Sequence, residues 1–587
     1  MKSKSHQFVF VLFVLIATAC TSPTPTAPAQ PTAAAAATSA PTTASTIEPT
    51  VAPTPTPAPA KIEAVRFDLG DDVLVQTHMP AGPFREMPIR LEGLIAVPPT
   101  GDNLPIAVVL HGNHGTGCPT GPDGEVGTWP CPDIEKKHYL GFAYLLEALA
   151  AQGYVAVSLN INPVYAAAYG EPNVATRLSP LVDVYLEKIA AANNGDDVGF
   201  GLDLKDRIDW NRLVMLGHSQ GGEGLNWVID AREARADQIN AGLGPIVAAV
   251  YLAPPAGPFP EKVSDVPLTV ILPACDHDVA DLSGQFNYER ARQQPDRQSL
   301  AASVYLPDAY HNGFNAALPS EAQGQTRSTC QPDLLLPAAA HQDFLARYVP
   351  HFFNVALSTA ALNLNDEDPA AIGLDPAQPA PSQMLDRSVL TSLALPTAQR
   401  LRLPLTKAAA QGAVTSTYCE AGRELPSDKM EVCRRSQFNQ PGLPENYVVT
   451  WKEANSAYEV AVPEGQQDLS GYTLVHLRAA VDPLSPLNAA DQPQSFSLRL
   501  TDGSGKSATV KLAGEPALAF PIGQKGYDDY FKWDTWNNHV LLSSIRVPLS
   551  AFTGIDLSDV QSAALVFDVT DSGSILVTDL EFLKTSQ

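Results

Sequence analysis

A short apolar segment, a Gly-x-Ser-x-Gly motif and a helical stretch follow one another without a break. The segment is Leu213–Leu216, the motif is Gly217-His218-Ser219-Gln220-Gly221, and the helical stretch is Gly224–Arg235. A serine in such a turn is held in a strained backbone conformation, and side chains in place of the two glycines would collide with the strand and the helix. The strain exposes the hydroxyl, and the helix N-terminus favours negative charge beside it. The arrangement predicts a buried strand that runs directly into a helix, with Ser219 as a nucleophile.

The chain around this motif alternates apolar runs with helical stretches from Ile62 to about Leu357. Continuous apolar strands separated by helices predict a mostly parallel sheet that is covered on both faces. The expected strands are Ile89–Val97, Ile106–Leu110, Tyr154–Leu159, Leu213–Leu216, Ile246–Leu252, Leu268–Leu272 and Ser303–Leu306. The expected helices are Tyr139–Gln152, Leu181–Ala192, Gly224–Arg235 and Ala338–Val355.

A serine hydroxyl is a poor nucleophile unless a base takes its proton and an acid orients that base. In enzymes with this turn, the acid follows the serine along the chain and the histidine comes last. The strand Leu268–Leu272 leads to Asp276 and Asp278, and either carboxylate could be the acid; we favour Asp276 because it lies nearer the strand end. His311 follows the last expected strand and is the predicted base. Two other histidines are expected to be structural or exposed: His277 and His341.

Acyl transfer also needs preorganised donors for the negative oxygen that develops on the substrate. One should be the backbone N–H of Gln220, directly after the nucleophile. The other should come from the loop after the strand Ile106–Leu110, and we favour the N–H of Asn113. His111 and His114 form an H-x-x-H pair in this loop, but no third ligand is evident in the sequence, so we predict no metal site.

Residues 62–357 resemble the α/β-hydrolase superfamily. The resemblance rests on residues 206–222, Asp-Arg-Ile-Asp-Trp-Asn-Arg-Leu-Val-Met-Leu-Gly-His-Ser-Gln-Gly-Gly, and on His111-Gly112. It is closest to the branch that holds dienelactone-hydrolase-like enzymes, secreted polyester hydrolases and acetylhydrolases of the platelet-activating-factor type. The resemblance covers about half of the chain and implies an eight-stranded, mostly parallel sheet, a Ser-His-Asp triad and an acyl-enzyme intermediate. The insertion Gly115–Asp133 beside the oxyanion loop departs from the family, and we expect it to shape the acyl pocket.

After Leu401 the helical pattern ends, and short alternating strands separated by turn clusters follow. Such alternation predicts an antiparallel β-sandwich. The segments Ile545–Gly554, Leu565–Asp568 and Ile575–Phe582 resemble the galactose-binding-like jelly rolls of carbohydrate-binding modules. We therefore expect a catalytic domain at 61–357, a Pro/Ala/Asp-rich linker at 358–400 and a jelly-roll domain at 401–587.

A cluster of aromatic residues lies in the predicted jelly roll. Exposed aromatic rings stack on sugar faces, so the cluster is a candidate glycan platform. We favour the alternative, in which the rings fill a core or pack against the catalytic domain. The cluster consists of Tyr527, Tyr530, Phe531, Trp533 and Trp536.

The N-terminus has the pattern of an export signal. The apolar run Phe8–Ala17 follows two lysines and is too short for a bilayer-spanning helix, which needs about 20 residues. Ala17-x-Ala19 suits ordinary signal peptidase; the same residues with Cys20 resemble a bacterial lipoprotein signal, which we favour, and which implies lipidation of Cys20. Residues 21–60 are almost entirely Thr, Pro, Ala and Ser, a composition that predicts a disordered tether. No other long apolar stretch exists, so we predict no transmembrane helix and expect a membrane anchor through the lipid at Cys20.

Six cysteines remain after Cys20, and six cysteines allow fifteen pairings. The choice with the shortest loops is Cys118–Cys131, Cys275–Cys330 and Cys419–Cys433. Such bridges persist in an oxidising compartment. They agree with an extracytoplasmic protein that is either secreted or held on the cell surface as a lipoprotein.

The charge balance excludes one class of partner. The chain carries 63 acidic and 38 basic residues, and nucleic-acid binding needs a surplus of bases. The sequence predicts a serine hydrolase that cleaves small or polymeric carboxylic esters and needs no metal or organic cofactor. Two alternatives stay open: a serine peptidase of the same superfamily, and a surface glycan-binding lipoprotein with an inactive hydrolase body. The intact Ser, acid and His weigh against the latter, and the absence of a preceding propeller-like domain weighs against an oligopeptidase.

Overall fold

The computed structural model describes residues 62–118, 129–170, 173–279, 281–319, 335–358, 368–420, 433, 444–483, 485–521, 523–528, 533–538 and 540–585. The predicted signal segment, Cys20 and the tether therefore lie outside the described residues. In the described ranges, no helix combines the length and the apolar character that crossing a membrane would take.

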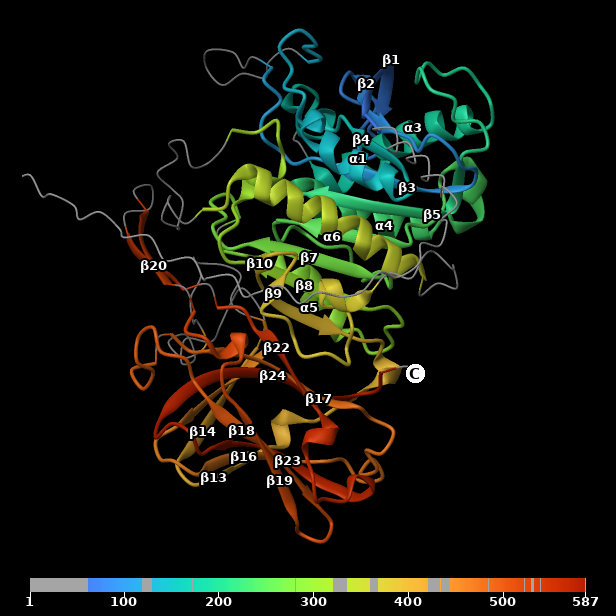
Figure 1. Cartoon of the computed structure of the whole chain (residues 1–587). Helices are drawn as coiled ribbons and strands as arrows, with labels where there is room; N and C mark the ends of the chain where they lie inside the picture. Colours follow the sequence, from blue (N-terminus) through green and yellow to red (C-terminus); the bar gives the residue numbers. More distant parts are fainter. Residues whose placement is uncertain are drawn as a thin grey trace, which may run out of the picture. The chain divides into compact units, whose positions relative to one another are not determined.

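A large mixed sheet organises the first part of the chain (Figure 1). Its strand order is β1-β2-β4-β3-β5-β6-β7-β8-β11. Neighbouring strands from β4 across to β8 are parallel, whereas β1, β2 and β11 join antiparallel at the two margins. The strands are β1 Val65–Val75, β2 Glu86–Ala96, β3 Leu104–Leu110, β4 Val155–Leu159, β5 Ile208–His218, β6 Ala248–Leu252, β7 Leu268–Pro273, β8 Ala301–Leu306 and β11 Leu390–Ala394.

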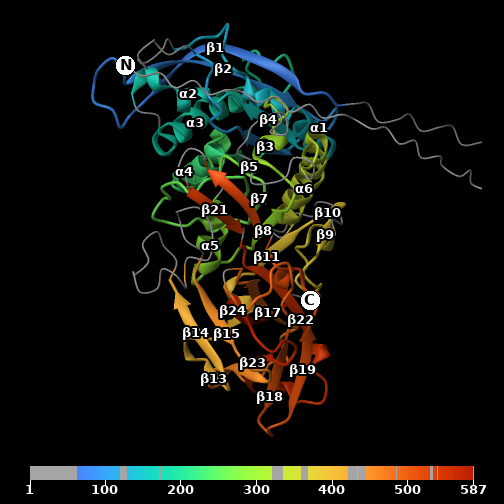
Figure 2. The same cartoon turned by 90° about the vertical axis from the view of Figure 1, so that its left-hand side faces the viewer.

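Helices cover both faces of this sheet because its central strands are apolar on both sides. On strand β3, Val108 packs in one core with α3 and α4, while Val109 packs in a second core with α1 and α6. Figure 2 shows these two groups of helices on opposite sides of the strands. The helices are α1 Ala143–Ala151, α2 Asn162–Tyr165, α3 Val174–Asn193, α4 Gln220–Glu233, α5 Gln285–Gln293 and α6 Ala338–Ser358.

The strands and helices expected from the sequence between residues 89 and 355 are present, with shifted ends. Strand β5 begins earlier than expected, and α3 begins at Val174, before Pro180. Proline usually marks the first turn of a helix, which is why the pattern suggested a later start. Four elements of this part were not predicted from the sequence: β1, α2, α5 and β11.

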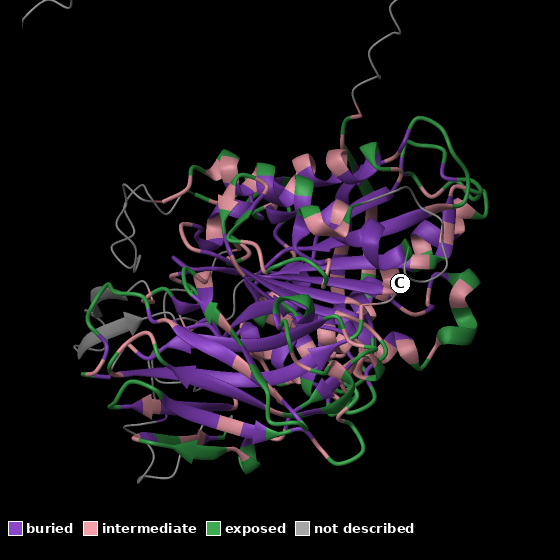
Figure 3. Ribbon diagram, turned by 60° about the horizontal axis from the view of Figure 1, so that its bottom comes forward, coloured by how far each residue is buried: buried purple, intermediate pink, exposed green. Residues whose placement is uncertain are grey.

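Two antiparallel sheets form the C-terminal part of the chain and share one apolar core. The first has the order β14-β15-β24-β17-β22, with β12 beside β24, and the second has the order β13-β16-β23-β18-β19. Val449, Leu477 and Phe582 of the first sheet pack with Leu498 and Leu565 of the second. Figure 3 shows that the strands of both parts of the chain are largely buried. The strands are β12 Arg400–Arg402, β13 Ala409–Gln411, β14 Val414–Cys419, β15 Asn446–Trp451, β16 Ser456–Ala461, β17 Leu474–Val481, β18 Phe496–Asp502, β19 Ser507–Leu512, β22 Ser543–Pro548, β23 Val560–Phe567 and β24 Gly573–Leu583.

The aromatic cluster falls largely on a separate hairpin of β20 (Gly523–Asp528) and β21 (Trp533–Asn538). Tyr527, Trp533 and Trp536 belong to these strands, whereas Tyr530 and Phe531 lie outside the described residues. Their role in glycan binding remains a prediction.

The segment expected to be a linker, 358–400, is structured from residue 368 onward. It contains the short strand pair β9 (Gln383–Met384) and β10 (Arg387–Ser388), and then β11, which pairs antiparallel with β8 along its whole length. Leu393 and Leu395 are buried. The sequence did not predict β11, because the apolar residues of this strand form only one short run within a proline-rich segment.

A buried network of charged side chains joins α5 to β12, β17 and β24; we call it the junction network. Arg478 donates to Glu289 at 2.6 Å and to Asp579 at 3.3 Å, and Arg292 donates to Asp579 at 2.7 Å. Burial alone would raise the pKa of Glu289, but Arg292 and Arg478 outweigh it and hold that pKa below its ordinary value. The network consists of Glu289, Arg292, Arg400, Arg478, Asp579 and Glu581.

Two of the three expected disulfides are present. Cys118–Cys131 and Cys419–Cys433 have Cα–Cα distances of 5.6 Å and 5.4 Å. Cys275 is also disulfide-bonded, but its expected partner Cys330 lies outside the described residues. The two described bridges fit an extracytoplasmic protein.

Candidate active site

Ser219 lies in the turn between β5 and α4. Its backbone has φ 54° and ψ −131°, a region that residues other than glycine rarely adopt. The turn is held from both sides, because the N–H of Ser219 donates to the carbonyl of Leu252 at 2.9 Å and the N–H of Gly222 donates to the carbonyl of Ser219 at 2.8 Å. The side chain therefore sits at the N-terminus of α4, where the helix dipole favours an anion.

The glycines around Ser219 are required by the space available. A Cβ at Gly217 would lie 2.4 Å from the carbonyl oxygen of Gly221, and one at Gly221 would lie 2.5 Å from that of His111. A Cβ at Gly112 would lie 2.4 Å from the Cβ of Ser219 and 3.0 Å from its Oγ. The loop after β3 therefore runs directly against the serine.

His311 follows β8 and is buried, with its Nδ1 2.8 Å from Oδ2 of Asp276. The other carboxylate oxygen of Asp276 accepts the backbone N–H groups of Asp278 at 2.9 Å and Val279 at 2.7 Å. Asp278 behaves differently: its side chain is 50% exposed, and its Oδ2 lies 3.4 Å from Nε2 of His311. The structure thus places Asp276 at the nitrogen where an orienting acid is needed.

Two further histidines support the loop that carries His311. Nε2 of His218, the last residue of β5, lies 3.2 Å from the carbonyl oxygen of His311, which joins the end of this strand to the turn after β8. Nε2 of His341 accepts the backbone N–H of Tyr310 at 2.9 Å, and its Nδ1 donates to Pro337 at 3.0 Å. The sequence predicted that His341 and His277 are structural or exposed. His341 is 1% exposed and holds the backbone of Tyr310, whereas His277 is partly exposed.

The expected oxyanion donors adjoin Ser219. Gln220 is the first residue of α4, where backbone N–H groups have no partner within the helix. Asn113 is one residue beyond Gly112, and its exposed side chain accepts the N–H of Gly115 at 3.3 Å. Neither backbone N–H, of Gln220 or of Asn113, has a hydrogen-bond partner among the described residues. Both are free to donate to an added oxygen.

His111 fixes the loop that carries Asn113. Its Nδ1 lies 2.8 Å from the carbonyl oxygen of Gly112, and its Nε2 accepts the backbone N–H of Ile161 at 3.0 Å. Burial lowers the pKa of His111 to about 3, so the ring stays neutral. Because both ring nitrogens are engaged within the fold, His111 is not available as a metal ligand.

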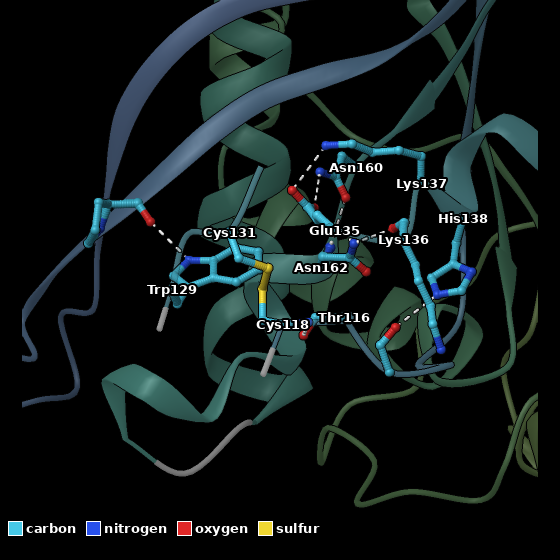
Figure 4. The surroundings of a disulfide bond; sticks show 12 residues. Thr116, Cys118, Trp129, Cys131, Glu135, Lys136, Lys137, His138, Asn160 and Asn162 are labelled. Atoms are coloured by element: carbon cyan, nitrogen blue, oxygen red, sulfur yellow. Dashed lines mark hydrogen bonds and ion pairs between the residues drawn. A yellow bond between two sulfur atoms is a disulfide. The ribbon is translucent and has the colours of Figure 1, made fainter. Parts of the chain in front are cut away.

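The insertion after this loop is tied to the body of the protein on several sides (Figure 4). Beside the Cys118–Cys131 bridge, Trp129 donates to the carbonyl of Pro88 at 3.0 Å, and His138 lies 2.9 Å from the carbonyl oxygen of Gly115. Glu135 accepts the side-chain amides of Asn160 at 2.7 Å and Asn162 at 2.9 Å. The ends of the insertion are therefore held against β2 and the segment after β4, while residues 119–128 lie outside the described part.

Three imidazoles lie close together next to the turn that carries Ser219, since His218 directly precedes the serine. One ring nitrogen from each of His114, His218 and His311 lies within 4.8 Å of the others, and this is the only such metal-ligating group found in the described residues. Burial, the largest cause, lowers the pKa of His114 to about 2 and that of His218 well below its ordinary value. Sequence reasoning missed this group because its members come from three segments that are far apart in the chain: the loop after β3, the end of β5 and the turn after β8.

Comparison with known proteins does not assign the site. The chain matches no known protein-family model, and no curated protein is significantly similar to it in sequence. The function therefore rests on the geometry.

Proposed function

We propose that this protein is a serine hydrolase that cleaves carboxylic esters through an acyl-enzyme intermediate. The observation that carries the proposal is the strained turn that holds Ser219 at the start of α4, together with a buried His311 whose Nδ1 lies 2.8 Å from Asp276. The backbone carbonyl of His311 lies 3.2 Å from Nε2 of His218, the residue before the serine. A nucleophile, a base and an orienting acid are the three parts that such chemistry requires.

In the proposed reaction, Oγ of Ser219 attacks the carbonyl carbon of the ester while Nε2 of His311 takes the serine proton. Asp276 keeps Nδ1 of His311 protonated, so that Nε2 carries the lone pair. The N–H groups of Gln220 and Asn113 stabilise the negative oxygen of the tetrahedral intermediate. His311 then gives its proton to the leaving alcohol, and water, deprotonated by His311, hydrolyses the acyl-enzyme to release the acid.

The proposal also includes the fold families of the two parts of the chain. Strands β1 to β8, most of them parallel and flanked by helices, support an α/β-hydrolase domain. The two C-terminal antiparallel sheets on one core support a jelly roll. Lipid attachment at Cys20, which would place the enzyme on the outer face of a membrane, rests on the sequence alone.

The direct test is hydrolysis of p-nitrophenyl esters, from acetate to long acyl chains, by the full chain and by Ser219→Ala. We expect activity that falls by about 10⁶-fold in the variant, because loss of a triad nucleophile leaves only residual catalysis. Equal activity in the two proteins would contradict the assignment of Ser219. Inactivity of the wild type across the series would exclude simple esters as substrates, and peptide substrates would be assayed next.

Replacing Gly112 with alanine tests the packing of the oxyanion loop on the serine. The added Cβ must displace Ser219 or the loop, and a displacement of about 1 Å can cost about 100-fold in rate. We expect kcat/KM for the best ester to fall by about that factor while the melting temperature changes little. Gly82→Ala is the matched control, because nothing lies within 4 Å of its Cβ position. Equal rates in the two variants would show that the loop does not constrain the serine.

A further inference from the structure

The grouped imidazoles of His114, His218 and His311 offer lone pairs that the proposed ester hydrolysis does not fully use. Nε2 of His114 has no hydrogen-bond partner among the described residues, and neither does Nδ1 of His218. His218 is wholly buried, so that its Nδ1 cannot be satisfied by bulk water. Buried polar atoms in native proteins are normally hydrogen-bonded, and an exception calls for an explanation such as an ion.

The rings also lie close to one another. Ring centroids are 5.3 Å apart for His114 and His218, 4.8 Å for His218 and His311, and 5.8 Å for His114 and His311. Imidazole ligands at about 2.0–2.1 Å from a tetrahedral ion would have nitrogens about 3.3 Å apart. The present spread of up to 4.8 Å therefore has to shrink modestly, and rotation of the partly exposed His114 side chain can supply this movement.

Carboxylates provide the charge that a dication needs. Asp276 bonds to Nδ1 of His311, the arrangement that orients a metal-binding histidine from behind. Asp278 places an oxygen 3.4 Å from Nε2 of His311, outside the group of three, and its half-exposed side chain would have to turn toward the other two rings to supply a fourth ligand. Two carboxylates balance one dication, and three imidazoles with one oxygen suit Zn²⁺ and its neighbours rather than Mg²⁺ or Ca²⁺.

We propose that His114, His218 and His311 form a binding site for a transition-metal dication such as Zn²⁺, and that the bound ion blocks the proposed catalytic base. The ion would occupy the lone pair of Nε2 of His311 that is needed to accept the serine proton. Metal binding itself does not depend on the proposed ester hydrolysis; only the inhibition does.

Metal binding is measured on full-length Ser219→Ala after removal of metals with a chelator. Titration with Co²⁺ should produce the visible bands of a four-coordinate ion, and calorimetry with Zn²⁺ should detect one site. His114→Asn in the same background should bind Zn²⁺ at least tenfold more weakly, because loss even of a residue behind a ligand costs about 10- to 100-fold in affinity. His78→Asn is the matched control, since His78 is exposed and outside the group, and it should bind as tightly as the parent.

Equal Zn²⁺ affinity in the His114→Asn and His78→Asn proteins would overturn the proposal. If His114→Asn does not fold, an anomalous difference map of a zinc-soaked Ser219→Ala crystal decides: a peak between the three imidazoles supports the site, and a peak elsewhere refutes it. In the wild type, Zn²⁺ should suppress ester hydrolysis and a chelator should restore it. If the Co²⁺ bands appear but the wild type hydrolyses no ester, the metal site is supported and the proposed esterase activity is refuted.

Discussion

Asp276→Asn should lower kcat for ester hydrolysis by about 10⁴-fold, the loss expected when the amide replaces a triad acid. One oxygen of Asp276 accepts two backbone N–H groups, from Asp278 and Val279, and the other faces Nδ1 of His311. An asparagine must keep its single oxygen toward the two N–H donors. Its NH₂ then faces Nδ1 and forces the proton onto Nε2, so that His311 can no longer act as a base.

Asp278→Asn is the matched variant, because the sequence alone left both carboxylates open as the acid. Its side chain is half-exposed and lies at Nε2 rather than Nδ1, so we expect a far smaller loss of kcat. The comparison is made from kcat and KM for one ester at a fixed pH, with circular dichroism to verify folding. A larger loss in Asp278→Asn than in Asp276→Asn would reverse the assignment of the acid.

Asp579→Asn should destabilise the protein by about 3–5 kcal/mol, because it removes the negative partner of buried arginines. Asp579 is 4% exposed and bonds to Arg292 at 2.7 Å and Arg478 at 3.3 Å. Denaturant unfolding at pH 7 measures the loss. Asp571→Asn, at an exposed position just before β24, is the control and should change stability by less than about 0.5 kcal/mol.

The pH dependence provides a second check on this variant. Burial tends to raise the pKa of Asp579, but the surrounding arginines outweigh it and hold the pKa well below its ordinary value. A carboxylate with a depressed pKa stabilises the fold above its unfolded pKa of about 4, and this stabilisation is lost as the pH falls toward the folded value. The difference in stability between wild type and Asp579→Asn should therefore shrink below about pH 4. A difference that grows on acidification would contradict the role of this carboxylate.

The sequence was informative where local patterns determine structure. The apolar runs that became β3 to β8 predicted the sheet, and the glycines around Ser219 predicted the turn, because both depend on neighbouring residues. The position of His311 after the last parallel strand followed from chain order. Asp276 and Asp278 could not be separated in this way, since two residues on one loop differ only in where their side chains point.

Other features depend on contacts between distant residues. Helix α5 is strongly polar, and its Glu289 and Arg292 are buried only because β17 and β24 supply Arg478 and Asp579. The grouping of His114 with His218 and His311 likewise needs three distant segments of the chain to converge. No pattern of spacing along the chain carries this information.

Strand β11 also determines where this chain can be divided. All six residues of β8 are buried, and β11 supplies the backbone partners on its outer side. A fragment that ended at Ser358 would leave β8 with a row of unpaired N–H and C=O groups beside an apolar surface, which is a template for pairing with other chains. Strand β11, which lies in the segment expected to be a linker, thus covers an edge that would otherwise promote aggregation. A soluble catalytic fragment would have to extend at least through Ala394.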